Sequence, residues 1–231
     1  MTRVASGRAP QVLVRAAKSR GGPHTRKPRS AAASHATPAR GAQSRVIRII
    51  GGSLRGRRLR FADVPDIRPT PDRVRETLFN WLGPRVHAAR CLDLFAGSGV
   101  LGLEALSRGA ASTVFVEQNA VAARALTTLI AEWNVQGARI ERGEALRFLA
   151  TGGADAAAKP IDIVFLDPPF AAGLLAQAAS LLEQHGWLAP EALIYVEASA
   201  RDALPPLPAH WQLSRAKRAG EVGYHLFVRP T

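Results

Sequence analysis

The feature that most constrains the fold is a regular alternation of apolar runs and helical patterns from Cys91 to the end of the chain. Continuous apolar runs predict strands buried on both faces, as in parallel sheets covered by helices on either side. The predicted strands are Cys91–Phe95, Thr113–Glu117, Ala138–Glu141, Ile161–Leu166, Leu193–Glu197, Trp211–Arg218 and Tyr224–Val228. The predicted helices are Gly99–Ser107, Ala120–Trp133, Ala145–Leu149 and Gly173–His185. The chain is therefore predicted to be an α/β protein with a mostly parallel seven-stranded sheet and an antiparallel C-terminal hairpin.

An N-terminal β-hairpin extension and a helix are predicted ahead of this sheet. Arg45–Ile50 and Leu54–Phe61 are β-rich, and Gly51-Gly52 between them predicts a tight turn. A helical pattern follows, with Thr70 as its N-cap and Gly83 at its end. We therefore expect three parts: residues 1–44 as a disordered basic tail, 45–85 as the hairpin and helix, and 86–231 as the main domain.

The positive charge of the chain is concentrated in its first third. The formal net charge is +13. Residues 1–44 hold nine Lys or Arg and no acid, residues 45–75 hold nine against three acids, and the remainder holds thirteen against fifteen. A basic arm beside a near-neutral body favours a nucleic-acid partner, with improved solubility as the alternative. Residues 1–44 lack aromatic side chains, which predicts disorder; they also fit a transit peptide, although an Ala- and Arg-rich composition favours a bacterial extension.

Several protein classes are excluded. The apolar runs are far shorter than the ~20 residues of a membrane span. Cys91 is the single cysteine, which excludes a disulfide scaffold and favours a reducing, cytoplasmic setting. No phosphate-binding G-x-x-x-x-G-K-[S/T] loop is present, and the six His residues lack a metal-ligand spacing, so no metal is expected.

The first chemically loaded strand end is the Asp-Leu-Phe-Ala-Gly-Ser-Gly run that begins at Asp93. Gly97, Gly99 and Gly102 fit G-x-G-x-x-G, and Glu117 follows Gly97 by twenty residues, which taken alone is a dinucleotide fingerprint. A carboxylate at Asp93 would repel a pyrophosphate but attract an ammonium group. Glu117 can accept both hydroxyls of a ribose. This corner is therefore predicted to bind a nucleoside that carries a positive charge.

The second loaded strand end is Asp167-Pro168-Pro169-Phe170, which follows four apolar residues. Prolines lack N–H donors and fix φ, so the loop is stiff and rich in carbonyl acceptors. A carboxylate, a rigid carbonyl and an aromatic ring suit a planar base with an exocyclic amine. The loop is therefore predicted to hold a nucleobase.

These two motifs together resemble those of S-adenosylmethionine-dependent amino-methyltransferases. The run from Arg68 to Leu82, with Arg48-Ile49-Ile50-Gly51-Gly52 and Arg55-Gly56-Arg57 before it, resembles the 16S rRNA guanine(966)-N2 methyltransferase family. The resemblance covers about residues 45–230. It implies a Rossmann-like class I methyltransferase fold, S-adenosylmethionine as cofactor, and methylation of the N2 amine of a guanine during small-subunit assembly.

The resemblance also implies roles for individual residues. The implied cofactor-binding residues are Arg68, Pro69, Thr70, Asp93, Phe95, Gly97, Ser98, Gly99, Glu117, Gln118, Glu144 and Ala145, with Glu144 standing where relatives carry Asp. The implied guanine-holding residues are Asp167, Pro168, Pro169 and Phe170. The expected RNA-binding residues are Arg45, Arg48, Arg55, Arg57 and Arg58 on the N-terminal hairpin and Arg215, Lys217, Arg218 and Tyr224 on the C-terminal one. The expected partner is 16S rRNA, within a partly or fully assembled small subunit, and the protein is expected to be a cytoplasmic monomer.

Three alternatives remain open. An Asp-Pro-Pro-aromatic loop also occurs in DNA adenine-N6 methyltransferases, so the loop alone does not select guanine or RNA. A non-catalytic RNA-binding protein on the same fold would bind no cofactor. An NAD-dependent oxidoreductase would use the glycine corner but would leave Asp167-Pro168-Pro169-Phe170 without a role.

Overall fold

The computed structural model describes residues 45–61, 70–152, 160–169 and 173–231. The predictions for residues 1–44, Arg68, Pro69 and Phe170, and for the side chain of Arg45, lie outside what it describes. The elements are β1 (Arg45–Arg48), β2 (Arg58–Phe61), α1 (Asp72–Leu82), the 3-10 helix η1 (Gly83–Val86), β3 (Arg90–Asp93), α2 (Val100–Ser107), β4 (Ser112–Glu117), α3 (Ala120–Trp133), β5 (Ala138–Arg142), α4 (Ala145–Ala150), β6 (Ile161–Leu166), α6 (Leu174–Gln184), β7 (Leu188–Ser199), β8 (Gln212–Ala219) and β9 (Val222–Val228).

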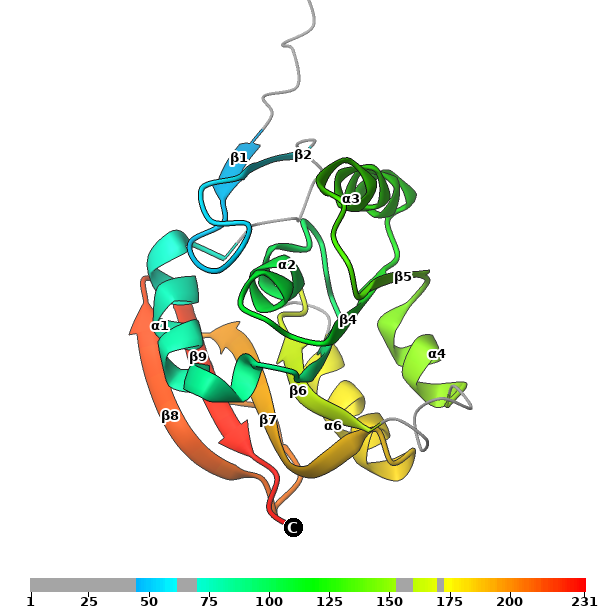
Figure 1. Cartoon of the computed structure of the whole chain (residues 1–231). Coiled ribbons are helices and arrows are strands. Elements are labelled where there is room, and N and C mark those ends of the chain that lie inside the picture. The colour runs from blue at the N-terminus through cyan, green and yellow to red at the C-terminus, as the bar shows by residue number, and fades with distance from the viewer. Residues whose placement is uncertain (1–44, 62–69, 153–159, 170–172) are drawn as a thin grey trace, which may run out of the picture. The chain divides into compact units, whose positions relative to one another are not determined.

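The central sheet has seven strands in the order β5-β4-β3-β6-β7-β9-β8 (Figure 1). Strands β5, β4, β3, β6 and β7 are parallel, and β9 is antiparallel to both β7 and β8. The prediction of a mostly parallel sheet with an antiparallel C-terminal hairpin is confirmed. β7 begins five residues earlier than predicted. The sequence pattern missed this first part because Pro190 and Glu191, which has a positive φ, interrupt the apolar run near a register shift between β6 and β7.

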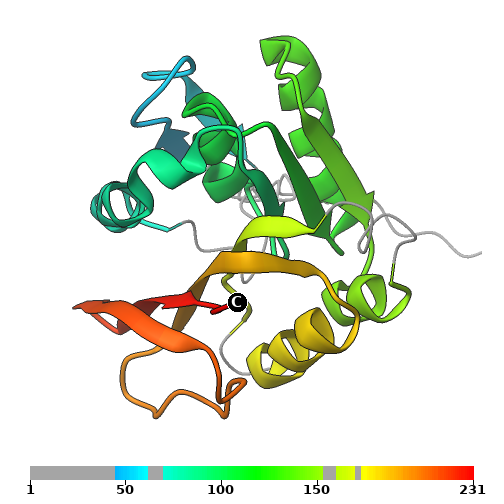
Figure 2. The same ribbon diagram turned by 60° about the horizontal axis from the view of Figure 1, so that its bottom comes forward.

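Helices cover both faces of the sheet, as Figure 2 shows. Successive side chains along each strand point to opposite faces of the sheet, so they pack into two separate hydrophobic cores. On β6, Ile163 and Phe165 pack with α1 and α2, whereas Val164 and Leu166 pack with α4 and α6. Because both faces are buried, the functional surface of this sheet is its edge, where the strands end.

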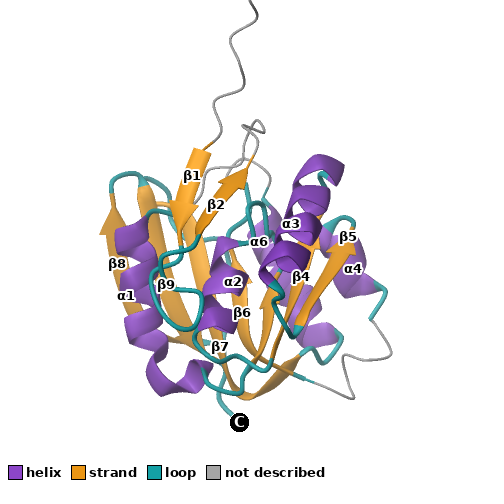
Figure 3. Cartoon of the chain, turned by 45° about the horizontal axis from the view of Figure 1, so that its top comes forward, coloured by secondary structure: helices purple, strands orange, loops and turns teal. Residues whose placement is uncertain are grey.

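The N-terminal hairpin is confirmed, but its Gly-Gly turn prediction is wrong. β1 and β2 are antiparallel, with Arg48 opposite Arg58, so the connection spans residues 49–57. Gly52 does adopt a positive φ of 73°, but a Cβ there would lie 1.7 Å from the carbonyl oxygen of Ser107. The glycine pair therefore lets this connection dock closely on α2 (Figure 3).

The predicted start of the next helix is also corrected. Helix α1 begins at Asp72 with Pro71 as its N-cap, and no side chain caps it. Thr70 instead donates its hydroxyl to Glu197 on β7 at 3.1 Å, because this long-range partner competes with the local cap. The predicted end holds, since α1 stops at Leu82, before Gly83.

Among the described residues, no helix is both long and apolar enough to span a membrane.

Candidate active site

The two loaded strand ends predicted from the sequence lie side by side. β3 and β6 are neighbours, with Asp93 opposite Phe165, so Asp167 emerges directly beside the end of β3. β7 flanks β6 on the other side, with Val196 opposite Leu166, which places Glu197 next to Asp167. Three acidic residues thus meet at one edge of the sheet.

The glycine corner after β3 is built by close packing. Gly99 has φ of 73°, and a Cβ there would lie 2.6 Å from the side chain of Leu126. A Cβ at Gly102 would lie 2.3 Å from the ring of Phe115. These glycines allow α2 to begin immediately against β4 and α3, which leaves Gly97 partly exposed at the turn.

Two carboxylates accept hydrogen bonds from backbone amides of the glycine corner. The amide of Gly102 donates to Asp93 at 3.0 Å, and the amide of Gly97 donates to Glu117 at 2.7 Å. Glu117 also accepts the amide of Asn119 at 2.6 Å. Asp93 is 3% exposed and Glu117 7%, so the corner rests on two nearly buried acids.

Burial dominates the electrostatics of Asp93. Desolvation, helped by the nearby charge of Glu117, raises the pKa of the Asp93 carboxyl to about 7, although the hydrogen bond from Gly102 opposes the shift. A bound cation would relieve this cost by favouring the ionised form.

Asp167 and Glu197 form a second acidic pair. Burial first, then the charges of Glu197 and Asp93, raise the pKa of Asp167 well above its ordinary value, and a hydrogen bond from Thr70 opposes them. Burial also raises the pKa of Glu197, against hydrogen bonds from Tyr195 and Thr70. The Tyr195 hydroxyl donates to Glu197 at 2.8 Å. Two carboxyls in such proximity favour retention of a proton between them.

Sequence reasoning assigned no chemistry to Glu197 or Tyr195. The signal was present in the sequence, because Glu197 ends an apolar run as Glu117 and Asp167 do. The placement of β7 beside β6 gives this residue its significance, and strand order is not a local property of the sequence.

The residues present fit a cationic nucleoside cofactor. Four nearly or partly buried carboxylates stand at adjoining strand ends, on Asp93, Glu117, Asp167 and Glu197. Within the described ranges, none of them is paired with a Lys or Arg. S-adenosylmethionine carries a sulfonium and an ammonium group, so its charge matches this unneutralised acidic edge.

The remaining predicted cofactor residues surround the same corner. Phe95 and Ser98 are partly exposed within the glycine loop, and Gln118 is exposed after β4. Glu144 is exposed at the N-cap of α4, and within the described ranges its carboxylate caps no amide of that helix. The amide of Gly143 donates to the carbonyl of Glu117 at 3.1 Å, which fixes the end of β5 beside that of β4.

The predicted RNA-binding residues fall into two regions. On the N-terminal hairpin Arg48, Arg55, Arg57 and Arg58 are exposed, and Arg57 lies over the ring of Trp133. On the C-terminal hairpin Arg215, Lys217 and Arg218 are exposed. Tyr224, by contrast, is 4% exposed and stacks on Trp81 with ring centroids 5.3 Å apart. Its ring is thus part of the packing between α1 and the sheet, with little free surface for a base.

Comparison with known proteins places most of the chain in one family. The sequence pattern of the family described as "Conserved hypothetical protein 95" matches residues 47–228. The chain is 52% identical over 183 residues to "Ribosomal RNA small subunit methyltransferase D" of Escherichia coli K12, covering 79% of this chain and 90% of that protein. It is 43% identical over 186 residues to the Haemophilus influenzae protein of the same name, covering 78% and 93% of the two chains.

Solved structures agree in fold. "Putative methyltransferase yhhF" from Escherichia coli is 50% identical with a TM-score of 0.73, covering 80% of this chain and 98% of that one. An RNA methyltransferase from Salinibacter ruber, solved with S-adenosyl-L-homocysteine, is 16% identical with a TM-score of 0.51, covering 71% and 94%. The second likeness concerns the fold alone. Together the two structures confirm the predicted class I methyltransferase fold.

Proposed function

Because the chain belongs to the "Conserved hypothetical protein 95" family, in which relatives 52% and 43% identical are small-subunit rRNA methyltransferases, we propose that it methylates the exocyclic N2 amine of guanine 966 in 16S rRNA, with S-adenosylmethionine as donor. The observation that carries the proposal is the adjacency of Asp167-Pro168 at the end of β6 to the glycine corner at the end of β3. One strand end suits a charged nucleoside and the other a flat amine.

The loop after β6 supplies acceptors for that amine. The Asp167 carboxyl and the backbone carbonyl of Pro168 accept hydrogen bonds from the two N2 hydrogens, which fixes the nitrogen lone pair toward the glycine corner. Pro168 is buried and Pro169 is exposed, so the loop is anchored at its first proline. Positioning of this kind can contribute about 7–11 kcal/mol for well-oriented reactants.

S-adenosylmethionine, when bound, supplies an already activated methyl group on a sulfonium. The chain therefore contributes no covalent nucleophile. Asp93 would hold the ammonium group, Glu117 the ribose hydroxyls, and Glu144 and Gln118 the adenine. As the amine acquires the methyl group it must lose a proton, and the raised pKa of Asp167 beside Glu197 suits that carboxyl to take it up.

The target base must leave its stack to reach this loop, at a cost of a few kcal/mol that is smallest for an unpaired base. Basic side chains of both hairpins hold the surrounding phosphates. We propose a 16S rRNA substrate within a partly or fully assembled small subunit, and a cytoplasmic, monomeric enzyme.

The test is Asp167→Asn, which keeps the side-chain shape and removes the carboxylate. We expect methyl transfer to fall by about a thousandfold or more, while calorimetric binding of S-adenosylmethionine stays within about threefold of the original. Mass mapping of methylated guanines in 16S rRNA, from cells with and without the gene, identifies the base. A methylated adenine, or substantial turnover by Asp167→Asn, contradicts the proposal.

A further inference from the structure

A basic pocket lies on the same edge of the sheet as the candidate active site. It is a cavity of about 460 Å³ between helix α1 and the β8–β9 hairpin. Its lining residues are Arg73, Thr77, Lys217, Arg218, Ala219, Gly220 and Tyr224. Its volume is in the range of small-ligand sites, about 300–1,000 Å³.

Strand register connects this pocket to Asp167. Lys217 on β8 is opposite Tyr224 on β9, and Tyr224 is opposite Glu197 on β7. Glu197 in turn stands next to Asp167 at the end of β6. With neighbouring strands about 4.8 Å apart, Lys217 lies about 14 Å across the sheet from Asp167.

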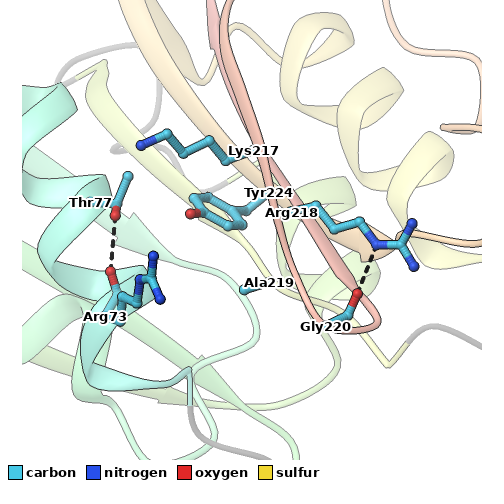
Figure 4. A pocket seen from close by; sticks show the side chains of 7 residues that line it. All are labelled: Arg73, Thr77, Lys217, Arg218, Ala219, Gly220 and Tyr224. Atoms are coloured by element: carbon cyan, nitrogen blue, oxygen red, sulfur yellow. Dashed lines mark hydrogen bonds between the residues drawn. The ribbon is translucent and has the colours of Figure 1, made fainter.

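The side chains of the pocket fall on two sides of the hairpin. Figure 4 shows Arg73, Thr77, Lys217 and the Tyr224 hydroxyl facing one another, whereas Arg218 extends to the other side. The reason is strand alternation, which directs consecutive residues to opposite faces. Arg218 donates to the carbonyl of Gly220 at 2.8 Å. The inner side of the pocket therefore has two cations, on Arg73 and Lys217.

These inner groups are unneutralised. In the part of the chain that the structure describes, no acidic side chain pairs with Arg73 or Lys217, and no group hydrogen-bonds the Tyr224 hydroxyl. The pocket thus brings together a guanidinium, an ammonium and a phenol group with no acidic side chain paired to them. Such a set of donors suits an anion with several oxygen acceptors. The pocket's contents are thus expected to be negatively charged.

The surroundings of the Tyr224 ring indicate whether the pocket fits a base or a phosphate. A stacking platform must present an exposed ring face. Tyr224 is 4% exposed, and Trp81 already stacks on it with planes 28° apart. The pocket therefore offers donors to oxygens and no free aromatic face to a base.

We propose that this pocket binds an RNA backbone phosphate flanking the methylated guanine, through Arg73, Lys217 and the Tyr224 hydroxyl. The proposal deepens the proposed function and rests on it. A phosphate held here, while the base is turned out into the loop after β6, fixes the nucleotide at two points. The pocket thereby selects how the strand enters the site.

The experiment compares the double variant Arg73→Ala/Lys217→Ala with the control variant Arg147→Ala. Arg147 is exposed on α4, at the opposite side of the sheet, and the described residues show no ion pair for it. Lys217→Arg tests rescue of the charge. The probes are deproteinised 16S rRNA and small subunits from a strain lacking this methyltransferase. The measurements are kcat, KM for RNA, S-adenosylmethionine affinity, and the salt dependence of RNA binding.

The double variant is expected to raise KM for both RNA substrates by about thirtyfold, with kcat and cofactor affinity within about twofold. The slope of log K against log salt is expected to become shallower by about 0.7–0.9, the change for the loss of one phosphate contact. Arg147→Ala and Lys217→Arg are expected to stay near the original values.

An unchanged KM and salt slope in the double variant overturns the proposal, as does a defect confined to small subunits, which would assign the pocket to a ribosomal protein. If the original enzyme methylates neither substrate, the proposed function fails. The salt slope for free RNA, measured by filter binding, still decides the pocket in that case.

Discussion

At the scale of single residues, the main feature is a group of four nearly or partly buried carboxylates, which have no Lys or Arg partner among the described residues. They belong to Asp93, Glu117, Asp167 and Glu197. Local patterns identified three of them from the sequence: Asp93 precedes the glycine turn, Glu117 ends a strand twenty residues after Gly97, and Asp167 follows an apolar run. Their placement costs stability in the free protein, because burial penalises the charged form. A bound cation recovers that cost, so the acidic edge favours ligand binding over stability of the free enzyme.

The pH dependence of stability should reveal Asp93. An acid whose folded pKa is raised to about 7 binds a proton in the folded state that the unfolded chain has released, so its contribution falls as pH rises from about 4 to 7. Asp93→Asn removes this penalty. We expect the variant to gain about 1–3 kcal/mol in free energy of unfolding relative to the original at pH 8, and roughly a third of that at pH 5. Urea unfolding at the two pH values measures this difference.

The same substitution should abolish calorimetric binding of S-adenosylmethionine, because a neutral amide cannot balance the ammonium group. A variant that is no more stable at pH 8 than the original, or that binds the cofactor normally, contradicts this role for Asp93.

Glu197 should set the pH range of catalysis. Asp167 must be ionised to accept a proton, so activity falls as pH drops through its raised pKa. Glu197→Gln removes the neighbouring charge and lowers the pKa of Asp167, although Asp93 still raises it. We therefore expect the acidic limb of the kcat–pH profile to move to lower pH.

Glu132→Gln, at an exposed position on α3, is the matched control and should leave the profile in place. If Glu197→Gln lowers kcat equally at every pH, Glu197 acts by positioning Thr70 and Tyr195 rather than through its charge.

At the scale of elements, local pattern predicted most helices and strands because each carries its own periodicity. Helix α3 has the predicted bounds, Ala120–Trp133, and β6 has its predicted bounds too. Contacts between distant elements could not be predicted in this way. Glu104 on α2 accepts the amides of Ile50 and Gly51 at 2.9 and 2.8 Å, a contact that no local pattern specifies.

The docking of the β1–β2 connection on α2 can be tested with two glycines. Gly52 and Gly56 both have positive φ, 73° and 84°, but a Cβ at Gly52 would strike Ser107, whereas one at Gly56 meets nothing within 4 Å. We expect Gly52→Ala to cost about 3 kcal/mol or more, and Gly56→Ala about 1 kcal/mol from backbone strain alone. Urea unfolding of both variants gives the comparison, and equal losses would show that docking adds nothing.

At the scale of the whole molecule, the basic arm and the methyltransferase body are separate in composition. The family pattern begins at residue 47, after the acid-free segment with nine Lys or Arg. Charge distribution indicated a polyanionic partner from the sequence, but it could not locate the contact points. The pocket between α1 and the β8–β9 hairpin depends on residues about 140 positions apart, such as Arg73 and Lys217.

Deletion of residues 1–44 should separate RNA affinity from catalysis. We expect the urea midpoint and cofactor affinity to be unchanged, because the matched family begins after this segment. RNA binding at low salt should weaken, and its log–log salt slope should become shallower by about 0.7–0.9 for each phosphate that the tail no longer neutralises. Loss of a cooperative unfolding transition after deletion would show that the segment is part of the folded body.

Strand β8 is the outermost strand of the sheet, and almost all of its residues are exposed, including Leu213 at 55%. Such a strand has free backbone groups that can pair with a second copy of the chain, and lysine or arginine side chains on an edge oppose this pairing. The positive charges of β8 therefore oppose self-association as long as no RNA neutralises them. They belong to Arg215, Lys217 and Arg218. Preparations in which these charges are removed or masked should become prone to aggregate as concentration rises.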